Sequence, residues 1–465
     1  MPLFILRVTQ NHPTFRIPSL LSIAQCFNFS IKFVSEDLFR GILIVELEKE
    51  EHVQHFLDRG ILVMWAAELY AQAESYEDLY KQLEAKSAVL EPWRESAVFK
   101  IAVESANLRM SCKREANIAR SFDVLGLRGP VDLTNPEVEF VVFEDYDWIN
   151  TVTKEDQIAR EGQFRHVYFG RRLGQSRARP MVHAHSIKTR EYYGNTSMES
   201  EMGFLMAGQT LCGPGKIVYD PFVGTGSLLY ACAHYGAMVM GSDIDGRQMR
   251  GKQRGKNAVP GIMRAARQYG VDSLLLDCAT FDVTRNPWRG GGWLDAIITD
   301  PPYGVRAGAK RLGKDEEKGR MLRDEPFILA DGTPAHLKPD YVPPARPYEM
   351  MHLTLDLIRF ARYMLVPGGR LVFFLPTVTE EYDAIDIPVV EGMTELKWED
   401  GSVQEFGKWG RRLVTMEKTA EDDGPVPTFD DYSVLEGTTA GHKDFNKRYA
   451  TGFRQRPEER QEGSS

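Results

Sequence analysis

Four consecutive residues, Asp300-Pro301-Pro302-Tyr303, place a carboxylate, two prolines and an aromatic ring directly after the mostly apolar run 294–299. Because proline cannot donate to a hydrogen-bond ladder, this order predicts a strand that ends in a rigid turn. In open α/β sheets, ligands bind at the carboxyl ends of strands. A planar amine would fit there, since Asp300 and the carbonyl of Pro301 can each accept one amine hydrogen while Tyr303 stacks on the ring. A purely structural proline turn, with Asp300 as a capping residue, explains these four residues equally well.

A glycine turn further upstream favours the ligand site. A short run typical of a buried strand, 217–220, and an apolar, helix-compatible run, 228–233, flank this turn. Within it, Gly224 and Gly226 allow a tight backbone and the close approach of a ligand. A strand, a glycine turn and a helix N-terminus together predict a nucleotide-sized site. The dinucleotide fingerprint has a third glycine where this chain has Leu229, which argues against NAD.

Acidic residues follow the other predicted strands at the same sheet edge. The second strand ends with Asp243 and Asp245, about twenty residues after the glycine turn, the usual distance for an acid that accepts from ribose hydroxyls. Asp243 is the better candidate, because Asp245 lies further into the loop. The third strand is expected to end at Asp277, which could accept a hydrogen bond from an adenine amine. With Asp220 and Asp300, four predicted strands end in Asp, an arrangement that four unrelated capping acids would rarely produce.

Together these residues resemble class I S-adenosylmethionine-dependent methyltransferases of the amino-methylating group. The resemblance covers about residues 195 to 418 and rests on the order of the glycine turn, the strand-end acids and the Asp-Pro-Pro-Tyr element. It implies a Rossmann-like α/β domain with a mostly parallel, seven-stranded sheet and a closing antiparallel hairpin. It also implies S-adenosylmethionine as the cofactor. The residues expected to bind this cofactor are Asp220, Pro221, Phe222, Gly224, Thr225, Gly226, Asp243, Ile244, Asp277 and Cys278.

The implied catalytic residues are Asp300, Pro301, Pro302 and Tyr303. An exocyclic amine conjugated to a purine is a poor nucleophile, so hydrogen bonds to Asp300 and Pro301 would localise its lone pair and aim it at the methyl group. Positioning supplies much of the rate in such a reaction, and a pocket that excludes water favours the loss of the sulfonium charge. Asp300 orients the amine first and accepts its proton second. No metal is required, and five cysteines without a Cys-x-x-Cys pair predict no zinc site in this chain.

The rest of the predicted catalytic domain, residues 190–418, fits the same fold. A charged insertion, 305–346, is rich in glycine and proline, and loops of that length are usually functional or disordered. The sequence is equally consistent with a mobile lid that faces the substrate and with a disordered insertion. The other expected elements are a helix over 348–364, a strand over 370–375 and a closing hairpin from 395–398 and 411–416.

Two further blocks precede the catalytic domain, and a polar tail follows it. Residues 1–85 are predicted to form an N-terminal α/β domain. Residues 95–178 resemble a THUMP domain, a small α/β module that in RNA-modifying enzymes holds the acceptor end of tRNA. A structural or oligomerisation domain is the alternative for this block. Residues 419–465 are polar and charged and are predicted to be mostly disordered, apart from a docking segment around 445–453.

The net charge of −9 is unfavourable for a nucleic-acid enzyme, but basic residues are concentrated locally. Seven lysines and arginines lie between Arg165 and Arg190 with no acidic residue among them. Such a stripe can bind phosphate even when the whole protein is acidic. A second stripe, 247–267, is interpreted as a solvated helix face. The residues predicted to bind RNA are Arg171, Arg172, Arg177 and Arg179.

The segment that joins the two parts of the chain indicates a more specific family. Together with 15–20 and 300–304, residues 193–198 closely resemble the catalytic subunits of eukaryotic tRNA guanine-10 N2-methyltransferases. That resemblance implies that Thr196 and Ser197 lie at the carboxylate of the cofactor. It also implies N2-methylguanosine in tRNA as the product, and a small zinc-binding activator subunit as a partner. A guanine inside a tRNA stem would have to be flipped out of its stack at a cost of a few kcal/mol.

Two other classes of function stay open at this point. The first is methylation of another amine, such as adenine N6 in DNA or RNA or a protein glutamine amide, because the catalytic element is the same. The second is a non-catalytic RNA-binding subunit, which the intact Asp300, Gly224, Gly226 and Asp243 disfavour. The sequence shows no membrane-spanning run and no signal peptide, so the cytoplasm is the expected location, with the nucleus as an alternative.

Overall fold

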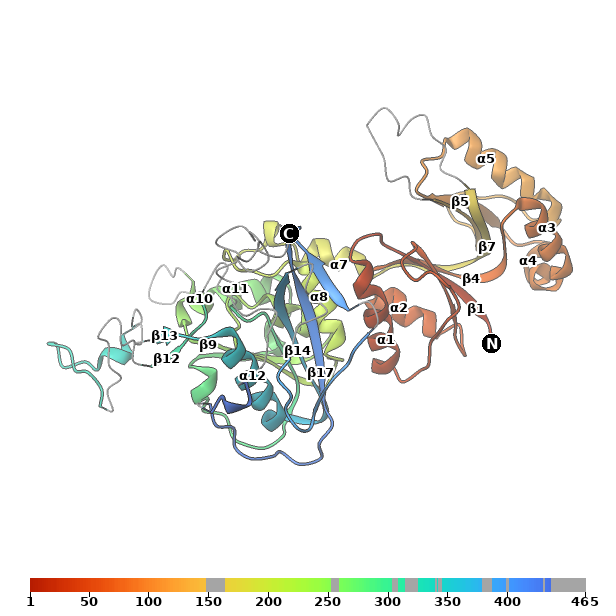
Figure 1. Cartoon of the computed structure of the whole chain (residues 1–465). Coiled ribbons are helices and arrows are strands. Elements are labelled where there is room, and N and C mark those ends of the chain that lie inside the picture. The colour runs from red at the N-terminus through yellow and green to blue at the C-terminus, as the bar shows by residue number, and fades with distance from the viewer. Residues whose placement is uncertain are drawn as a thin grey trace, which may run out of the picture. The chain divides into compact units, whose positions relative to one another are not determined.

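The computed structural model describes residues 1–147, 164–251, 259–302, 308–313, 325–338, 341, 345–378, 387–398, 401–429 and 431–435. The chain divides into two compact units, and each contains its own large sheet (Figure 1). The first unit comprises Met1–Arg16 and Ile23–Pro180, whereas the second comprises Ile17–Ser22 and continues from Met181.

The first unit is built on one seven-stranded sheet with the order β2-β3-β1-β4-β7-β6-β5. Its strands are β1 (Leu3–Val8), β2 (Lys32–Phe33), β3 (Ile42–Glu46), β4 (Val63–Ala73), β5 (Phe99–Ala106), β6 (Val138–Tyr146) and β7 (Phe164–Gln175). Its helices are α2 (His52–Arg59), α3 (Tyr76–Ala85), α4 (Glu91–Arg94) and α5 (Cys112–Ser121), and it contains both ends of α1 (Arg16–Cys26). α5 packs on β5, whereas α3 packs on β4 and β7 (Figure 1).

The sheet of the first unit runs through both predicted N-terminal blocks. β4 from the first block pairs antiparallel with β7 from the second, from Trp65 opposite Gln175 to Ala73 opposite Val167. Buried aromatic side chains of both blocks share one core, in which the ring of Phe169 stacks on those of Phe122 and Phe140. The division at residues 85–95 therefore stays a prediction, and the backbone pairing is continuous across it.

The second unit contains the predicted Rossmann-like sheet, with the order β10-β9-β8-β11-β14-β17-β15 and with β16 paired to β17. The neighbouring strands β10, β9, β8, β11 and β14 are parallel, and β17 runs antiparallel to its neighbours. The strands are β8 (Ile217–Asp220), β9 (Met238–Asp243), β10 (Leu275–Thr280), β11 (Leu294–Thr299), β14 (Leu365–Val378), β15 (Met393–Glu395), β16 (Ser402–Glu405) and β17 (Trp409–Lys418). The helices are α7 (Arg179–Ala184), α8 (Ser200–Gln209), α9 (Ser227–His234), α10 (Gly246–Arg250), α11 (Gly261–Gln268) and α12 (Met350–Met364).

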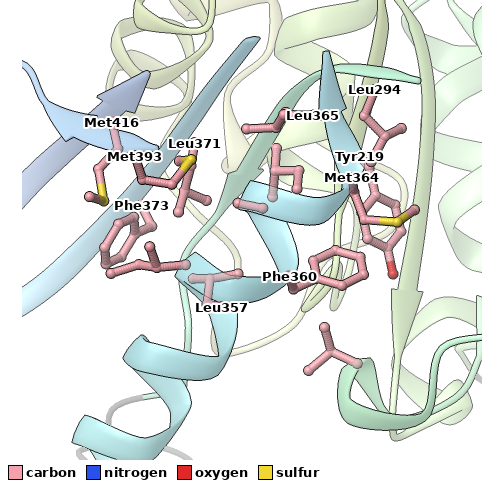
Figure 2. Packing of buried hydrophobic residues seen from close by; sticks show 14 of the residues in the cluster. Tyr219, Leu294, Leu357, Phe360, Met364, Leu365, Leu371, Phe373, Met393 and Met416 are labelled. Carbon is pink, nitrogen blue, oxygen red and sulfur yellow. The ribbon is translucent and has the colours of Figure 1, made fainter. Parts of the chain in front are cut away.

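The core of the second unit fixes the strands that carry the site. Figure 2 shows Leu357, Phe360 and Met364 of α12 beside the buried side chains of β11 and β14. Burial of each such side chain contributes about 1.5–3 kcal/mol relative to exposure. β11 is buried over most of its length, as expected for a parallel strand covered on both faces. Since β8 lies between β9 and β11, the strand order reverses there, and this switch point predicts a crevice at the carboxyl ends of β8 and β11.

Two details of the predicted sheet are wrong. The third strand does not end at Asp277, because its register shifts between Leu275 and Asp277 and the strand continues to Thr280, which lies opposite Asp243. The closing strands also differ from the prediction. β15 ends at Glu395, and the additional strand β16 forms the hairpin with β17, so the sheet has eight strands.

The insertion and the tail are partly structured in their described residues. β12 (Lys310–Leu312) and β13 (Ala345–Pro347) of the insertion form a two-stranded antiparallel sheet. The tail predicted to begin at 419 is hydrogen-bonded to the rest of the second unit, because Tyr432 donates a hydrogen bond of 2.8 Å to the buried carboxylate of Asp356. The proposed docking segment at 445–453 lies outside the described residues.

Candidate active site

The carboxyl ends of β8, β9 and β11 border a cavity of about 460 Å³. This volume lies within the usual range for sites that bind small molecules. The segment 196–199 and the hairpin of β16 and β17 complete its wall. The lining residues include Thr196, Ser197, Met198, Asp220, Phe222, Gly224, Thr225, Asp243, Ile244, Asp245, Asp300, Pro301, Pro302, Lys310, Gln404, Phe406, Trp409 and Arg411.

The two glycines of the turn have different surroundings. Both have positive φ, 50° at Gly224 and 84° at Gly226, which side chains adopt only with strain. A Cβ built on Gly224, which lines the cavity, would lie 4.0 Å from its nearest neighbour, the carbonyl oxygen of Phe222. A Cβ on Gly226 would lie 2.6 Å from the side chain of Ile262. Gly224 therefore keeps space open at the cavity, whereas Gly226 lets the turn pack against α11.

Asp220 is a buried carboxylate at the end of β8 that lines the cavity. It accepts hydrogen bonds from the hydroxyl of Thr299 at 2.7 Å and from the backbone N–H of Phe222 at 3.0 Å. Burial raises the pKa of Asp220 to about 7 despite these hydrogen bonds, because desolvation disfavours the charged form. A cationic ligand in the cavity would oppose this effect.

Asp243 connects the end of β9 to the glycine turn. Its Oδ2 accepts from the backbone N–H of Gly224 at 2.9 Å, and its Oδ1 accepts from that of Asp245 at 2.8 Å. Burial raises the pKa of Asp243 to about 6. Asp245 instead pairs with Arg247, whose guanidinium lowers the pKa of that carboxyl. At the carboxyl ends of β8 and β9, the cavity wall thus has two carboxylates with a raised pKa, Asp220 and Asp243, and one with a lowered pKa, Asp245.

The segment before α8 is fixed against the glycine turn by hydroxyl groups. The side chains of Ser197 and Thr225 lie 2.7 Å apart, and the backbone N–H of Gly194 donates to Ser197 at 2.9 Å. Thr196 and Ser197 both line the cavity, together with Thr225. Residues that are about thirty positions apart in the sequence are therefore adjacent at the predicted position of the cofactor's carboxylate.

The Asp-Pro-Pro element lies at the same cavity, directly after β11. Asp300, Pro301 and Pro302 are lining residues, and Tyr303 lies outside the described residues. Oδ2 of Asp300 accepts a hydrogen bond of 3.1 Å from Nη1 of Arg411 on β17. Arg411 is not among the residues predicted from the sequence. No local motif marks it, because the two residues are 111 positions apart and only the pairing of β14 with β17 brings them together.

Other predicted cofactor residues do not line this cavity. Pro221 and Gly226 belong to the turn itself, whereas Asp277 and Cys278 lie within β10. Asp277 is exposed and accepts from the adjacent backbone N–H of Cys278 at 2.7 Å. Burial raises the pKa of the Cys278 thiol to about 12, so this thiol is not reactive. Phe406 and Trp409, which are also absent from the predicted site, form a stacked aromatic pair in the cavity wall.

The predicted RNA-binding arginines of the first unit all have protein partners. The side chain of Arg172 is only 4% exposed and pairs with Glu104 and Glu139, so its binding to RNA stays a prediction that these contacts disfavour. Arg171 pairs with Glu50 and Glu68. Arg179 donates to the carbonyl of Ile61 at 2.9 Å, and the more exposed Arg177 pairs with Asp58. Charge neutralisation by these acids favours a structural role for Arg171 and Arg172.

Within the described ranges, no group of three or more histidine, cysteine or carboxylate side chains is placed to hold a metal ion. Among the helices of those ranges, none is both long and apolar enough to cross a membrane.

Known proteins resemble the chain over nearly its whole length. Residues 2–178 match the Tmrp11 THUMP N-terminal domain, and residues 188–315 match the RMKL-like methyltransferase domain. The tRNA (guanine(10)-N(2))-methyltransferase of Saccharomyces cerevisiae is 34% identical over 97% of this chain and 100% of its own length. The human tRNA (guanine(10)-N(2))-methyltransferase TRMT11 is 30% identical over 97% of this chain and 96% of its own length.

A solved structure adds a more distant likeness. The crystal structure of TrmN from Thermus thermophilus has a TM-score of 0.40 and 16% identity, and the match covers 90% of this chain and 99% of that chain. The two closer relatives and the two matched domains identify the family: this chain belongs to the tRNA (guanine(10)-N(2))-methyltransferases.

Proposed function

We propose that this chain transfers a methyl group from S-adenosylmethionine to the exocyclic N2 amine of a guanine in tRNA, at position 10. The observation that carries this proposal is that the wall of one cavity contains both residues suited to the cofactor and residues suited to the acceptor amine. Asp220 and Asp243 lie on the side below β8 and β9, and Asp300 and Pro301 lie on the side below β11. The names of the relatives, which cover nearly the whole chain, support the same substrate.

The side below β8 and β9, which we call the cofactor side, suits a cationic nucleoside. Gly224 leaves space where a Cβ would intrude, and the buried carboxylates of Asp220 and Asp243 favour a positive charge. Thr196, Ser197 and Thr225 offer hydroxyls for a carboxylate, and Asp243 remains the candidate for the ribose. When bound, S-adenosylmethionine supplies a methyl group made electrophilic by the positively charged sulfur.

The side below β11, which we call the acceptor side, suits an amine. Asp300 and the carbonyl of Pro301 accept the two hydrogens of the guanine amine, which localises the nitrogen lone pair and aims it at the cofactor side. Asp300 accepts the released proton after transfer. The stacking role of Tyr303 stays a prediction, and the Phe406 and Trp409 pair supplies a further aromatic surface. A paired guanine reaches this wall only after it has been flipped out of the stem.

The partners follow from the same family. The first unit, with its match to a THUMP domain, would hold the tRNA by shape more than by sequence. A small zinc-binding activator subunit would bind an edge of the methyltransferase sheet. Edge strands present unpaired backbone groups, and the edge strand β10 also exposes Leu276 at 52%. We expect the enzyme to act in the cytoplasm.

The test is mass spectrometry of nucleosides from tRNA that has been incubated with the purified chain, its activator and S-adenosylmethionine. N2-methylguanosine is the expected product, and it should be absent with Asp300→Ala. A methylated adenine, or methylation of protein in place of RNA, would assign the cavity to another amine. Binding of tRNA without any methylated product would support a non-catalytic RNA-binding subunit.

A further inference from the structure

Arg411 lies at the start of β17 with a side chain only 13% exposed, and it lines the cavity. A guanidinium this deeply buried requires partners for its donors, because an unpaired buried charge costs several kcal/mol. Each nitrogen of this guanidinium has one. Nε donates to Oε1 of Gln404 at 2.7 Å, Nη1 to Oδ2 of Asp300 at 3.1 Å and Nη2 to the sulfur of Met198 at 3.3 Å.

The plane of the guanidinium is fixed as well. Its Cζ lies 4.2 Å from the centre of the Phe374 ring, and Phe374 is itself completely buried in β14. Cations over aromatic faces are attracted by the ring, and more strongly where water is excluded. Contacts from β14, β16 and the segment before α8 therefore give the Arg411 side chain one orientation, in which Nη1 points at Asp300.

We infer that Arg411 is a positioning residue, which holds the carboxylate of Asp300 at the angle where it accepts from the guanine amine. The inference rests on the proposed function and assigns one residue to the acceptor side of that site. Because Nη2 contacts Met198 in the segment that carries Thr196 and Ser197, Arg411 also links the acceptor side to the cofactor side of the cavity.

The physical need for such a residue is clear from the side chain of aspartate. The terminal torsion of a carboxylate is broad, so its oxygens are aimed only when hydrogen bonds hold them. A charge-assisted bond from arginine is stronger than a neutral one and directional. An ionised carboxylate offers about four acceptor sites, so the bond from Arg411 is compatible with a bond from an amine. A displacement of 1 Å at the reacting atoms can cost about 100-fold in rate.

Arg412, the next residue of β17, is a matched control. Its side chain is 16% exposed, nearly the same as that of Arg411, and it pairs with Glu395 on β15. It does not line the cavity. If Arg411 only stabilised the closing strands, replacement of either arginine should have the same effect. If Arg411 positions Asp300, only its replacement should lower the rate of methyl transfer.

The test compares Arg411→Met, Arg411→Lys and Arg412→Met in the full chain with its activator. We expect Arg411→Met to lower kcat about 100-fold, with KM for tRNA and Kd for S-adenosylmethionine changed by less than about threefold. Arg411→Lys should recover part of kcat, because lysine keeps the charge but cannot bind three partners in one plane. Arg412→Met should leave kcat within about threefold even if it lowers the melting temperature as much.

A double-mutant cycle with Asp300→Asn separates positioning from stability. If Arg411 acts through Asp300, the Arg411→Met change should have little further effect on kcat once Asp300 is Asn. Full kcat in Arg411→Met, equal losses in Arg411→Met and Arg412→Met, or effects that multiply in the cycle would overturn the inference. If the wild-type chain methylates a different amine, the proposed function fails, but the cycle still tests whether Arg411 acts through Asp300.

Discussion

The cofactor side and the acceptor side of the cavity are built in different ways. On the cofactor side, Gly224, Asp220 and Asp243 lie within about 25 residues of one another, and hydrogen bonds within the turn and from the turn to the end of β9 hold them. On the acceptor side, Asp300 depends on Arg411, which is 111 positions away and comes from the antiparallel strand β17. The cofactor side is thus a local motif, whereas the acceptor side is completed by tertiary structure.

The largest expected effect separates the chemistry of the two sides. Asp300→Asn should lower kcat by about 1,000-fold, because the amine loses a charged acceptor, while the affinity for S-adenosylmethionine changes little. Asp220→Asn should instead weaken the binding of S-adenosylmethionine. Single-turnover rates and calorimetric titrations measure the two properties independently. Loss of cofactor affinity in Asp300→Asn would contradict the division of the cavity into two sides.

A second pair of variants tests the local design of the cofactor side. Gly226→Ala should destabilise the protein by about 2–4 kcal/mol, since the residue has positive φ and its Cβ would overlap Ile262. Gly224→Ala should cost about 1–2 kcal/mol for its positive φ and should mainly weaken cofactor binding. Urea denaturation gives the stabilities, and calorimetry gives the affinities. Equal effects of both variants on stability and on affinity would show that the two glycines do not differ in role.

The pH dependence of cofactor binding should reveal the buried carboxylates. Without ligand, the pKa of Asp243 is about 6 and that of Asp220 about 7, so both bind protons in weakly acidic solution. A cationic ligand favours their ionised forms and therefore releases protons, so the affinity should rise with pH between about 6 and 7. We expect an increase of up to about tenfold for S-adenosylmethionine.

The control for this prediction is S-adenosylhomocysteine, which lacks the sulfonium charge. Its affinity should change less over the same pH range, and Asp220→Asn should reduce the pH dependence for S-adenosylmethionine. An equal pH dependence for both ligands would mean that the carboxylates do not sense the sulfonium.

The smallest effect is expected at Lys310, an exposed residue of the insertion that lines the cavity. Lys310→Ala should raise KM for tRNA about two- to threefold without changing kcat, because one phosphate contact in solution contributes little and is screened by salt. Steady-state kinetics at two salt concentrations check this. A lower affinity for S-adenosylmethionine would instead assign Lys310 to the cofactor side.

The same contrast explains what the sequence could predict. The glycine turn, Asp220, Asp243 and the Asp-Pro-Pro element follow strand ends directly, so the period of the apolar residues was enough to place them at one edge of the sheet. Asp277 was misplaced because β10 pairs with β9 for three residues beyond it, and a register shift between Leu275 and Asp277 moves Asp277 one position further from the strand end. No repeat or motif in the sequence predicts such a register shift.

Long-range ion pairs were the contacts that the sequence predicted least well. Arg411 carries no local signal, and its partner becomes evident only when β17 pairs with β14. Arg172 was assigned to RNA because no acid lies near it in the sequence, yet Glu104 and Glu139 approach it from β5 and β6. A stripe of basic residues in a sequence therefore predicts an exposed basic face only where no acidic side chains on neighbouring strands form ion pairs with it.

The most direct measurement compares two tRNAs that differ only at nucleotide 10, with guanosine in one and inosine in the other. Inosine lacks the 2-amino group but keeps the other groups of the guanine ring. The proposed function predicts methyl transfer to the guanosine tRNA and none to the inosine tRNA, with similar affinities for both. Methyl transfer to the inosine tRNA at a comparable rate would contradict N2 as the acceptor and with it the role of Asp300.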